Sequence, residues 1–148
     1  MKRTTYLACA LVLAVAAWPL APPFASPRCY PTTRFVVLAG GLVRDTLTKL
    51  VWQQQPSSTT MDQSVALSYC SSRGFRLPTI KELELLVDLT VTSGPTINQT
   101  AFAGTQAESF WTSSPYAHSY GDAWFVNFGD SGSNYFSVNL PFKVRCVR

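Results

Sequence analysis

The segment Gly74–Asp88, which reads GFRLPTIKELELLVD, restricts the fold of this chain more than any other stretch. Pro78 disfavours a helical conformation at the residue before it, so a helix is expected to begin after that point. Thr79 and Glu82 have the spacing of a capping box. Apolar residues then recur at helical spacing, namely Ile80, Leu83, Leu86 and Val87. The segment predicts an amphipathic helix of about 10–13 residues, which is too short to be stable without a sheet to pack on.

A second capping-box pattern upstream, from Thr60 to Gln63, predicts another helix of about the same length. Residues at helical spacing form its expected buried face, namely Met61, Val65, Ala66, Tyr69 and Cys70. Gly74 is expected to end this helix, because glycine readily adopts the left-handed conformation found at helix C-termini. The sequence therefore predicts two consecutive short helices.

Strand-like patterns lie on both sides of the two predicted helices. The runs RFVVL and LVRD are separated by Gly40-Gly41, which predicts a β-hairpin, and KLVWQQ predicts a strand from Lys49. A meander that reaches the C-terminus is expected after the helices, with strands at 109–113, 123–128, 134–138 and 143–148. Two short helices packed on a small antiparallel sheet make this an α+β fold.

The first 25 residues have the layout of a secretory signal peptide. Lys2 and Arg3 precede an apolar run from Leu7 to Leu20, and small or turn-forming residues follow. This run is shorter than the ~20 residues that span a bilayer, which favours a cleaved leader over an uncleaved anchor. We expect an exported protein, periplasmic, cell-surface or extracellular, with a signal peptide at 1–25, a short lead-in at 26–33 and one domain at 34–148.

Loss of this leader would lower the charge of the chain. The formal net charge falls from +4 to +2, because Lys2 and Arg3 are removed and 10 basic residues remain against 8 acidic ones. No cluster of Lys and Arg of the kind that follows a phosphate backbone remains. We therefore expect no nucleic-acid partner. Hydrophobic residues make up 47% of the chain and charged residues 14%, which fits a folded domain rather than a disordered one.

Export would place the cysteines in an oxidising compartment. Cys29, Cys70 and Cys146 lie beyond the predicted leader, so one disulfide and one leftover thiol are expected. A structural zinc site needs four ligands, mostly cysteine and histidine, and the sequence contains one histidine, His118. We therefore expect neither a metal ion nor another cofactor.

Six segments in this order resemble a bacterial domain family of unknown function, DUF1566, also called the Lcl C-terminal domain. They are VRDTLTKLVWQ, a helix that ends in YC, GFRLPTIKEL, FWTSS, AWFVNF and the terminal VRCVR, and they cover roughly residues 34–148. The resemblance implies a variant of the C-type lectin-like fold, related to sulfatase-modifying-factor domains, with a disulfide between the first helix and the last strand. Cys70 and Cys146 stand at the two matching positions.

The same resemblance implies recognition rather than catalysis. The best-known member is the C-terminal domain of a collagen-like adhesin that engages sulfated polysaccharides, so we expect an adhesin-like, carbohydrate-binding protein. The cations expected to contact a sulfated chain are Lys143, Arg145, Arg148 and Arg76. The sequence lacks the calcium-ligand triplets of long-loop lectins and the active-site cysteine pair of the formylglycine-generating relatives, so neither of their activities is implied. A protein–protein or envelope-assembly module is the alternative.

Two loops near the C-terminus supply the expected recognition surface. Tyrosines and polar residues lie in or beside them, namely Tyr116, His118, Tyr120, Asp122, Asp130, Asn134 and Tyr135. Loop tyrosines accompanied by Ser, Gly and Asn form adaptable binding surfaces, as in antibody paratopes. The alternative is ordinary solvated loops whose tyrosines pack along the rim. We predict that these loops bind the ligand, together with Lys143 and Arg145.

Other residues that suggest a binding role are better explained by structure. Arg76 could hold an anion, but an ion pair or backbone brace near Glu82 is the favoured interpretation. Trp52, Trp111 and Trp124 could stack on sugar rings. They lie in alternating strand patterns, however, where tryptophan more often belongs to the core.

His118 is the one candidate for a catalytic base. Ser113, Ser119 and Asp122 lie close to it in the sequence, so the set resembles a hydrolytic triad in composition. No strained nucleophile turn or oxyanion-hole motif accompanies these residues. We therefore expect a protein that is not an enzyme.

Overall fold

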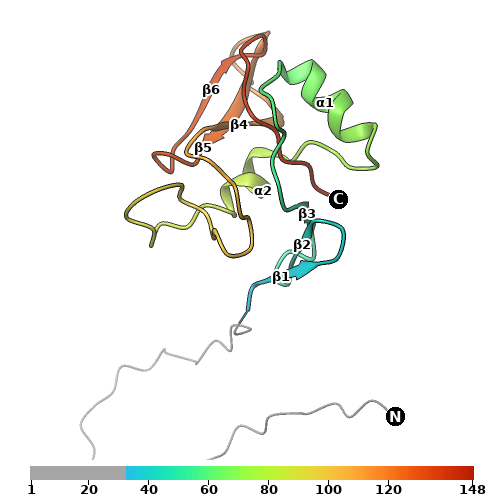
Figure 1. Ribbon diagram of the computed structural model, residues 1–148. Coiled ribbons are helices and arrows are strands. Elements are labelled where there is room, and N and C mark those ends of the chain that lie inside the picture. The colour runs from blue at the N-terminus through green and yellow to red at the C-terminus, as the bar shows by residue number, and fades with distance from the viewer. Residues whose placement is uncertain (1–32) are drawn as a thin grey trace, which may run out of the picture.

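The computed structural model describes residues 33–148, so the predicted signal peptide, most of the lead-in and Cys29 lie outside the described residues. The described chain has an α+β fold with two three-stranded antiparallel sheets and two helices, α1 (Gln63–Ser71) and α2 (Ile80–Glu84). Figure 1 shows the sheets at opposite ends of the domain, with α2 between them and α1 beside the second sheet. The prediction of a single small sheet was therefore wrong.

The first sheet contains the predicted hairpin. Its strands are β1 (Phe35–Leu38), β2 (Leu42–Asp45) and β3 (Val51–Gln53), in the order β1-β2-β3. Gly40 and Gly41 connect β1 to β2 with φ angles of +79° and +69°. L-residues with a side chain rarely adopt such angles, so the Gly-Gly step determines where the chain reverses.

The second sheet carries the loops that the sequence analysis singled out. Its strands are β4 (Ser109–Pro115), β5 (Asp122–Asn127) and β6 (Ser133–Ser137), in the order β4-β5-β6. All neighbouring strands in this sheet are antiparallel. These three strands confirm the first three members of the predicted meander, with small shifts at their ends.

The C-terminal segment, residues 143–148, links the two sheets. It was predicted to be a continuous strand, but it forms single β-bridges with different parts of the chain. Lys143 pairs with β4, whereas Val147 pairs with Trp52 of β3 and with Arg76. Because successive residues bond to different neighbours, no ladder extends along the segment, and the two sheets remain separate.

The predicted capping box from Thr60 to Gln63 was wrong. Asp62 is the N-cap residue of α1, and its side chain makes no capping hydrogen bond. Met61 instead exchanges two backbone hydrogen bonds with Phe142, with N···O distances of 2.9 and 3.2 Å. This bridge holds Met61 in an extended conformation, so the helix begins later and is shorter than predicted. Val65, which was expected on the buried face of this helix, is exposed. Gly74 follows the helix with φ +72°, as expected for a glycine at a helix C-terminus.

The capping box of α2 forms as predicted. Thr79 accepts a hydrogen bond from the backbone N–H of Glu82, and Glu82 accepts one from the backbone N–H of Thr79. The helix nevertheless has five residues, because Val87 beyond it forms a β-bridge with Ile97. Neither helix within residues 33–148 is long and apolar enough to cross a membrane.

The apolar core has two parts, one on each face of the second sheet. The first joins the first sheet, α2 and the segment before β4, and contains Val43, Trp52, Leu83, Leu86, Ile97, Ala101, Phe102, Phe110, Val126, Phe128 and Val147. The second lies beneath α1 and contains Ala66, Cys70, Leu77, Trp111, Ala123, Val144 and Cys146. Trp52 and Trp111 are thus core residues, as predicted.

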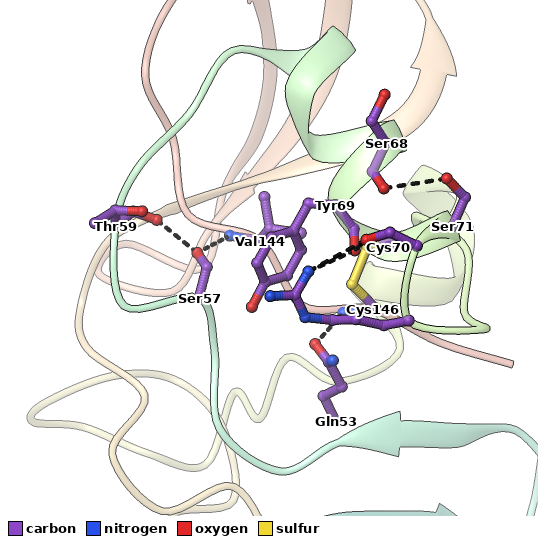
Figure 2. Close-up of a disulfide and its surroundings, with 11 residues drawn as sticks. Gln53, Ser57, Thr59, Ser68, Tyr69, Cys70, Ser71, Val144 and Cys146 are labelled. Atoms are coloured by element: carbon purple, nitrogen blue, oxygen red, sulfur yellow. Dashed lines mark hydrogen bonds between the residues drawn. A yellow bond between two sulfur atoms is a disulfide. The ribbon is translucent and has the colours of Figure 1, made fainter.

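The Cys70–Cys146 disulfide joins α1 to the C-terminal segment within the second core. The Cα atoms of the two cysteines are 5.5 Å apart, and both residues are fully buried. Figure 2 shows the bridge with Gln53 and Ser57, which accept hydrogen bonds from the backbone N–H groups of Cys146 and Val144. The pairing implied by the family resemblance is confirmed.

Arg76 and Glu82 form the predicted ion pair beside the start of α2. The guanidinium of Arg76 donates two hydrogen bonds to the carboxylate, with N···O distances of 2.8 and 2.6 Å. These bonds lower the pKa of Glu82 from 4.5 to about 2, and the hydrogen bonds from Thr79 add to the effect. Glu82 therefore has two structural roles, as the capping residue and as the partner of Arg76.

Replacing Glu82 with Gln is expected to lower the free energy of unfolding by about 1–2 kcal/mol at neutral pH. Half of the Arg76 side chain is exposed, so solvent screening keeps the contribution of the ion pair modest. Because the pKa of Glu82 is lower in the folded state, its contribution is complete above pH 4.5 and is lost as the pH falls through about 2. The melting temperatures of the wild type and of Glu82→Gln, measured across this pH range, should converge at the acidic end. A difference in melting temperature that does not change with pH would contradict the ionic explanation.

Candidate ligand-binding surface

Four aromatic side chains from the predicted loops and their strands gather on one face of the second sheet. This aromatic cluster consists of Tyr116, His118, Trp124 and Tyr135. The rings of Tyr116 and Tyr135 are stacked, with their centroids 3.5 Å apart and their planes 4° from parallel. Trp124 meets both tyrosines edge to face, at 5.6 and 5.7 Å, and His118 lies 5.6 Å from Tyr116.

The strand register of the second sheet creates this cluster. Trp124 of β5 lies directly opposite Tyr135 of β6, and side chains of directly opposite residues project from the same face of a sheet. The β4–β5 loop brings in Tyr116, whose backbone N–H donates to the carbonyl of Asp122 at 3.0 Å. Gly121 has φ +94° and allows the chain to turn back into β5.

The cluster presents a ring surface to solvent. Tyr135 is 38% exposed, whereas Trp124 is half-buried. Tyr120, in the β4–β5 loop, is fully exposed. Phe136, which is 55% exposed, follows Tyr135 on β6 and therefore projects from the opposite face of the sheet.

Polar groups flank the aromatic cluster at both ends of β6. Ser133 donates a hydrogen bond of 2.6 Å to the carboxylate of Glu84 on α2. At the other end, Ser137 lies opposite Asp122. The hydrogen bond with Tyr135 raises the pKa of Tyr116, and the nearby negative charge of Asp122 contributes to this increase. Two carboxylates, those of Glu84 and Asp122, therefore lie at the two ends of the cluster.

The structure brings some of the predicted loop residues together and separates others. Tyr116, His118 and Tyr135 lie in the aromatic cluster, and Asp122 lies beside it. Asn134 adjoins Tyr135 on β6, faces the other side of the sheet, and accepts a hydrogen bond from the backbone N–H of Tyr135. The other predicted loop residues are Tyr120, which is fully exposed, and Asp130, which accepts a hydrogen bond from Gly132 in the β5–β6 turn.

The prediction that Arg145 contacts a ligand was wrong, because its side chain is fully buried. Its guanidinium donates hydrogen bonds to the backbone carbonyls of Gln53 and Gln54 and to the hydroxyl of Thr105. It also lies 4.8 Å from the centroid of the Phe102 ring. Burial lowers the pKa of Arg145 to about 9, so the group remains cationic at neutral pH. Arg145 is an internal brace between the C-terminal segment and β3.

The other predicted cations also interact with the protein itself. The ammonium of Lys143 donates hydrogen bonds to the carbonyls of Ser57 and Ser58 and lies 3.8 Å from the carboxylate of Glu108. Arg76 is paired with Glu82, as described above. The guanidinium of Arg148 lies 4.7 Å from the centroid of the Phe75 ring. None of these contacts involves the aromatic cluster.

The structure offers no support for a triad around His118. The hydroxyl of Ser113 donates to the carbonyl of Pro78 at 3.2 Å, which directs it towards the start of α2. Within residues 33–148, no hydrogen bond joins His118 to Ser113, Ser119 or Asp122. The same part of the chain contains no group of three or more His, Cys, Asp or Glu side chains that could hold a metal ion.

Sequence reasoning missed four members of this surface, namely Trp124, Glu84, Ser133 and Ser137. Trp124 was assigned to the core, although it lies half-buried within the cluster. Glu84 and Ser133 are 49 positions apart in the chain, and no local pattern predicts their hydrogen bond. One signal in the sequence could have revealed Ser133. Successive side chains of a strand point to opposite faces of the sheet, so Ser133 and Tyr135 of β6 are expected on the same face.

A groove with a volume of about 690 Å³ lies elsewhere, beside β1. Its walls come from β1, from the chain after α2 and from the segment before β4, and include Phe35, Val37, Leu86, Asp88 and Asn98. None of the residues predicted to bind a ligand lines this groove.

Comparison with known proteins extends these observations. Residues 41–148 match the profile of the Lcl C-terminal domain family. The matched region includes α1, α2, both cysteines of the disulfide and the complete aromatic cluster. No curated protein matches the sequence.

Proposed function

Since the chain belongs to the Lcl C-terminal domain family, we propose that it is an exported, non-catalytic recognition domain with a C-type lectin-like fold that binds glycans at the cell surface. The observation that carries this proposal is the aromatic cluster. Tyr116 and Tyr135 are stacked, Trp124 packs edge to face against both, and Tyr135 is 38% exposed.

A rigid, partly exposed aromatic surface suits a sugar ring. The C–H face of a hexose is apolar and packs against an aromatic ring, while its hydroxyl groups remain free to form hydrogen bonds. Tyrosine and tryptophan also lose little conformational entropy on binding, because each side chain has two χ angles. Their mutual stacking restricts both tyrosines before any ligand arrives, which lowers the cost of binding further.

A glycan array probed with the oxidised protein is expected to show reproducible binding that is lost when Tyr116 and Tyr135 are both replaced with alanine. The array should contain neutral and sulfated polymers and be read at low and at physiological salt. Circular dichroism and a thermal melt would establish that the variant is folded. A blank array from folded wild-type protein would overturn the proposal.

Protein–protein recognition is the second candidate, and the full exposure of Tyr120 favours it. Solvent-exposed aromatic residues are enriched where proteins bind one another. A pull-down from an envelope extract would compare the wild type with a variant in which Tyr116, Tyr120 and Tyr135 are all alanine. Capture of the same proteins by the triple variant would exclude these tyrosines as the interface.

A further inference from the structure

We propose that the glycan recognised by this domain is a neutral oligosaccharide, which lies along β6 with one sugar ring on Tyr135. This inference rests on the proposed glycan binding and specifies the chemical class of the ligand. It follows from three features of the second sheet: the aromatic centre, the polar groups at both of its ends and the local negative charge.

The aromatic centre and the polar ends share one face of the sheet. Ser133, Tyr135 and Ser137 alternate along β6, so their side chains project in the same direction. Trp124 and Asp122 lie opposite Tyr135 and Ser137 in the register of β5. The face therefore has stacked rings in the middle and hydroxyl and carboxylate groups on either side.

The distance between the polar ends fits a short chain of sugars. Ser133 and Ser137 are four residues apart, which corresponds to about 13 Å at the usual rise of a strand. This length exceeds a single hexose ring. A central sugar on Tyr135 would thus have neighbours whose hydroxyl groups reach the Glu84–Ser133 pair at one end and the Asp122–Ser137 pair at the other.

The charge on this face argues against a sulfated ligand. Glu84 and Asp122 are both acidic, and carboxylates accept hydrogen bonds from sugar hydroxyls, whereas they repel sulfate groups. Two of the four cations that were expected to bind sulfate are engaged elsewhere: Arg145 is buried, and Lys143 is bonded to the carbonyls of Ser57 and Ser58. The face therefore favours a ligand with hydroxyl donors and no negative charge.

Titration with neutral β-linked glucan and mannan oligosaccharides, and in parallel with heparin, followed by tryptophan fluorescence and calorimetry, tests the inference. We expect saturable binding that high salt leaves unchanged, because no ionic contact is screened. Tyr135→Ala should weaken binding on the order of tenfold, whereas Tyr135→Phe should retain it, since stacking depends on the ring. Phe136→Ala is the matched control, because it removes an exposed aromatic ring from the opposite face of the same strand.

The possible results separate this inference from the proposed function. Salt-resistant binding of a neutral oligosaccharide, lost in Tyr135→Ala and kept in Phe136→Ala, would support both. Binding of heparin alone, abolished by salt, would overturn the neutral class and leave glycan recognition intact. Neutral binding that Tyr135→Ala does not affect would overturn the site on β6. Failure of folded protein to bind either class would overturn both proposals.

Discussion

Replacing Cys70 and Cys146 together with alanine is expected to lower the free energy of unfolding by about 4–5 kcal/mol. The two cysteines are 76 positions apart, so the disulfide removes much of the conformational freedom of the unfolded chain. The total stability of a domain is typically about 5–15 kcal/mol, and loss of this bridge would remove a large part of it. Guanidinium denaturation, followed by circular dichroism, measures the difference.

Cys29→Ala is the matched control for this experiment. Cys29 lies outside the described residues, and Cys70 and Cys146 are already paired with each other. The control is therefore expected to denature at the same guanidinium concentration as the wild type. Equal destabilisation by Cys29→Ala, or a disulfide-linked peptide that contains Cys29 and one of the other two cysteines, would contradict the pairing.

Replacing Arg145 with alanine is expected to destabilise the domain by about 3–5 kcal/mol. The substitution leaves a cavity beside Phe102 and removes the guanidinium that donates hydrogen bonds to the carbonyls of Gln53 and Gln54 and to the hydroxyl of Thr105. It also removes a buried charge, which is favourable, but the lost packing and the unpaired carbonyls outweigh that gain. Urea or guanidinium denaturation gives the free-energy difference directly.

Arg145→Met separates the two effects. Methionine fills much of the same volume and has no charge, but it donates no hydrogen bond. The variant is expected to be less stable than the wild type and more stable than Arg145→Ala. Stability equal to or above that of the wild type would show that desolvation of the guanidinium costs more than its hydrogen bonds contribute, as occurs when some buried ionic groups are replaced by apolar ones.

Local signals in the sequence predicted individual elements well. Gly40-Gly41 predicted the first hairpin, because few other residues tolerate the positive φ angles that this turn requires. Thr79 and Glu82 predicted the start of α2, because their reciprocal hydrogen bonds involve residues three positions apart. Local signals did not predict the length of α2. The helix ends at Glu84, because Val87 soon after it forms a β-bridge with the distant Ile97.

The candidate site was predicted in part. The sequence indicated the loops that carry Tyr116, His118 and Tyr135, because loop tyrosines with small polar neighbours are a compositional signal. It did not indicate that Tyr116 and Tyr135 would stack, nor that Asn134 would face away from them. These features depend on the register between β5 and β6, which pairs Trp124 with Tyr135.

The sequence by itself determined the family, the hairpin, the start of α2 and, through the family resemblance, the Cys70–Cys146 pairing. Each of these depends on residues close together in the chain or on a recognisable order of segments. Only the tertiary structure decided the division into two sheets, the burial of Arg145 and the formation of the aromatic cluster. The physical reason is that burial, strand register and neighbouring charge depend on contacts between distant segments, which are made only when the whole domain packs.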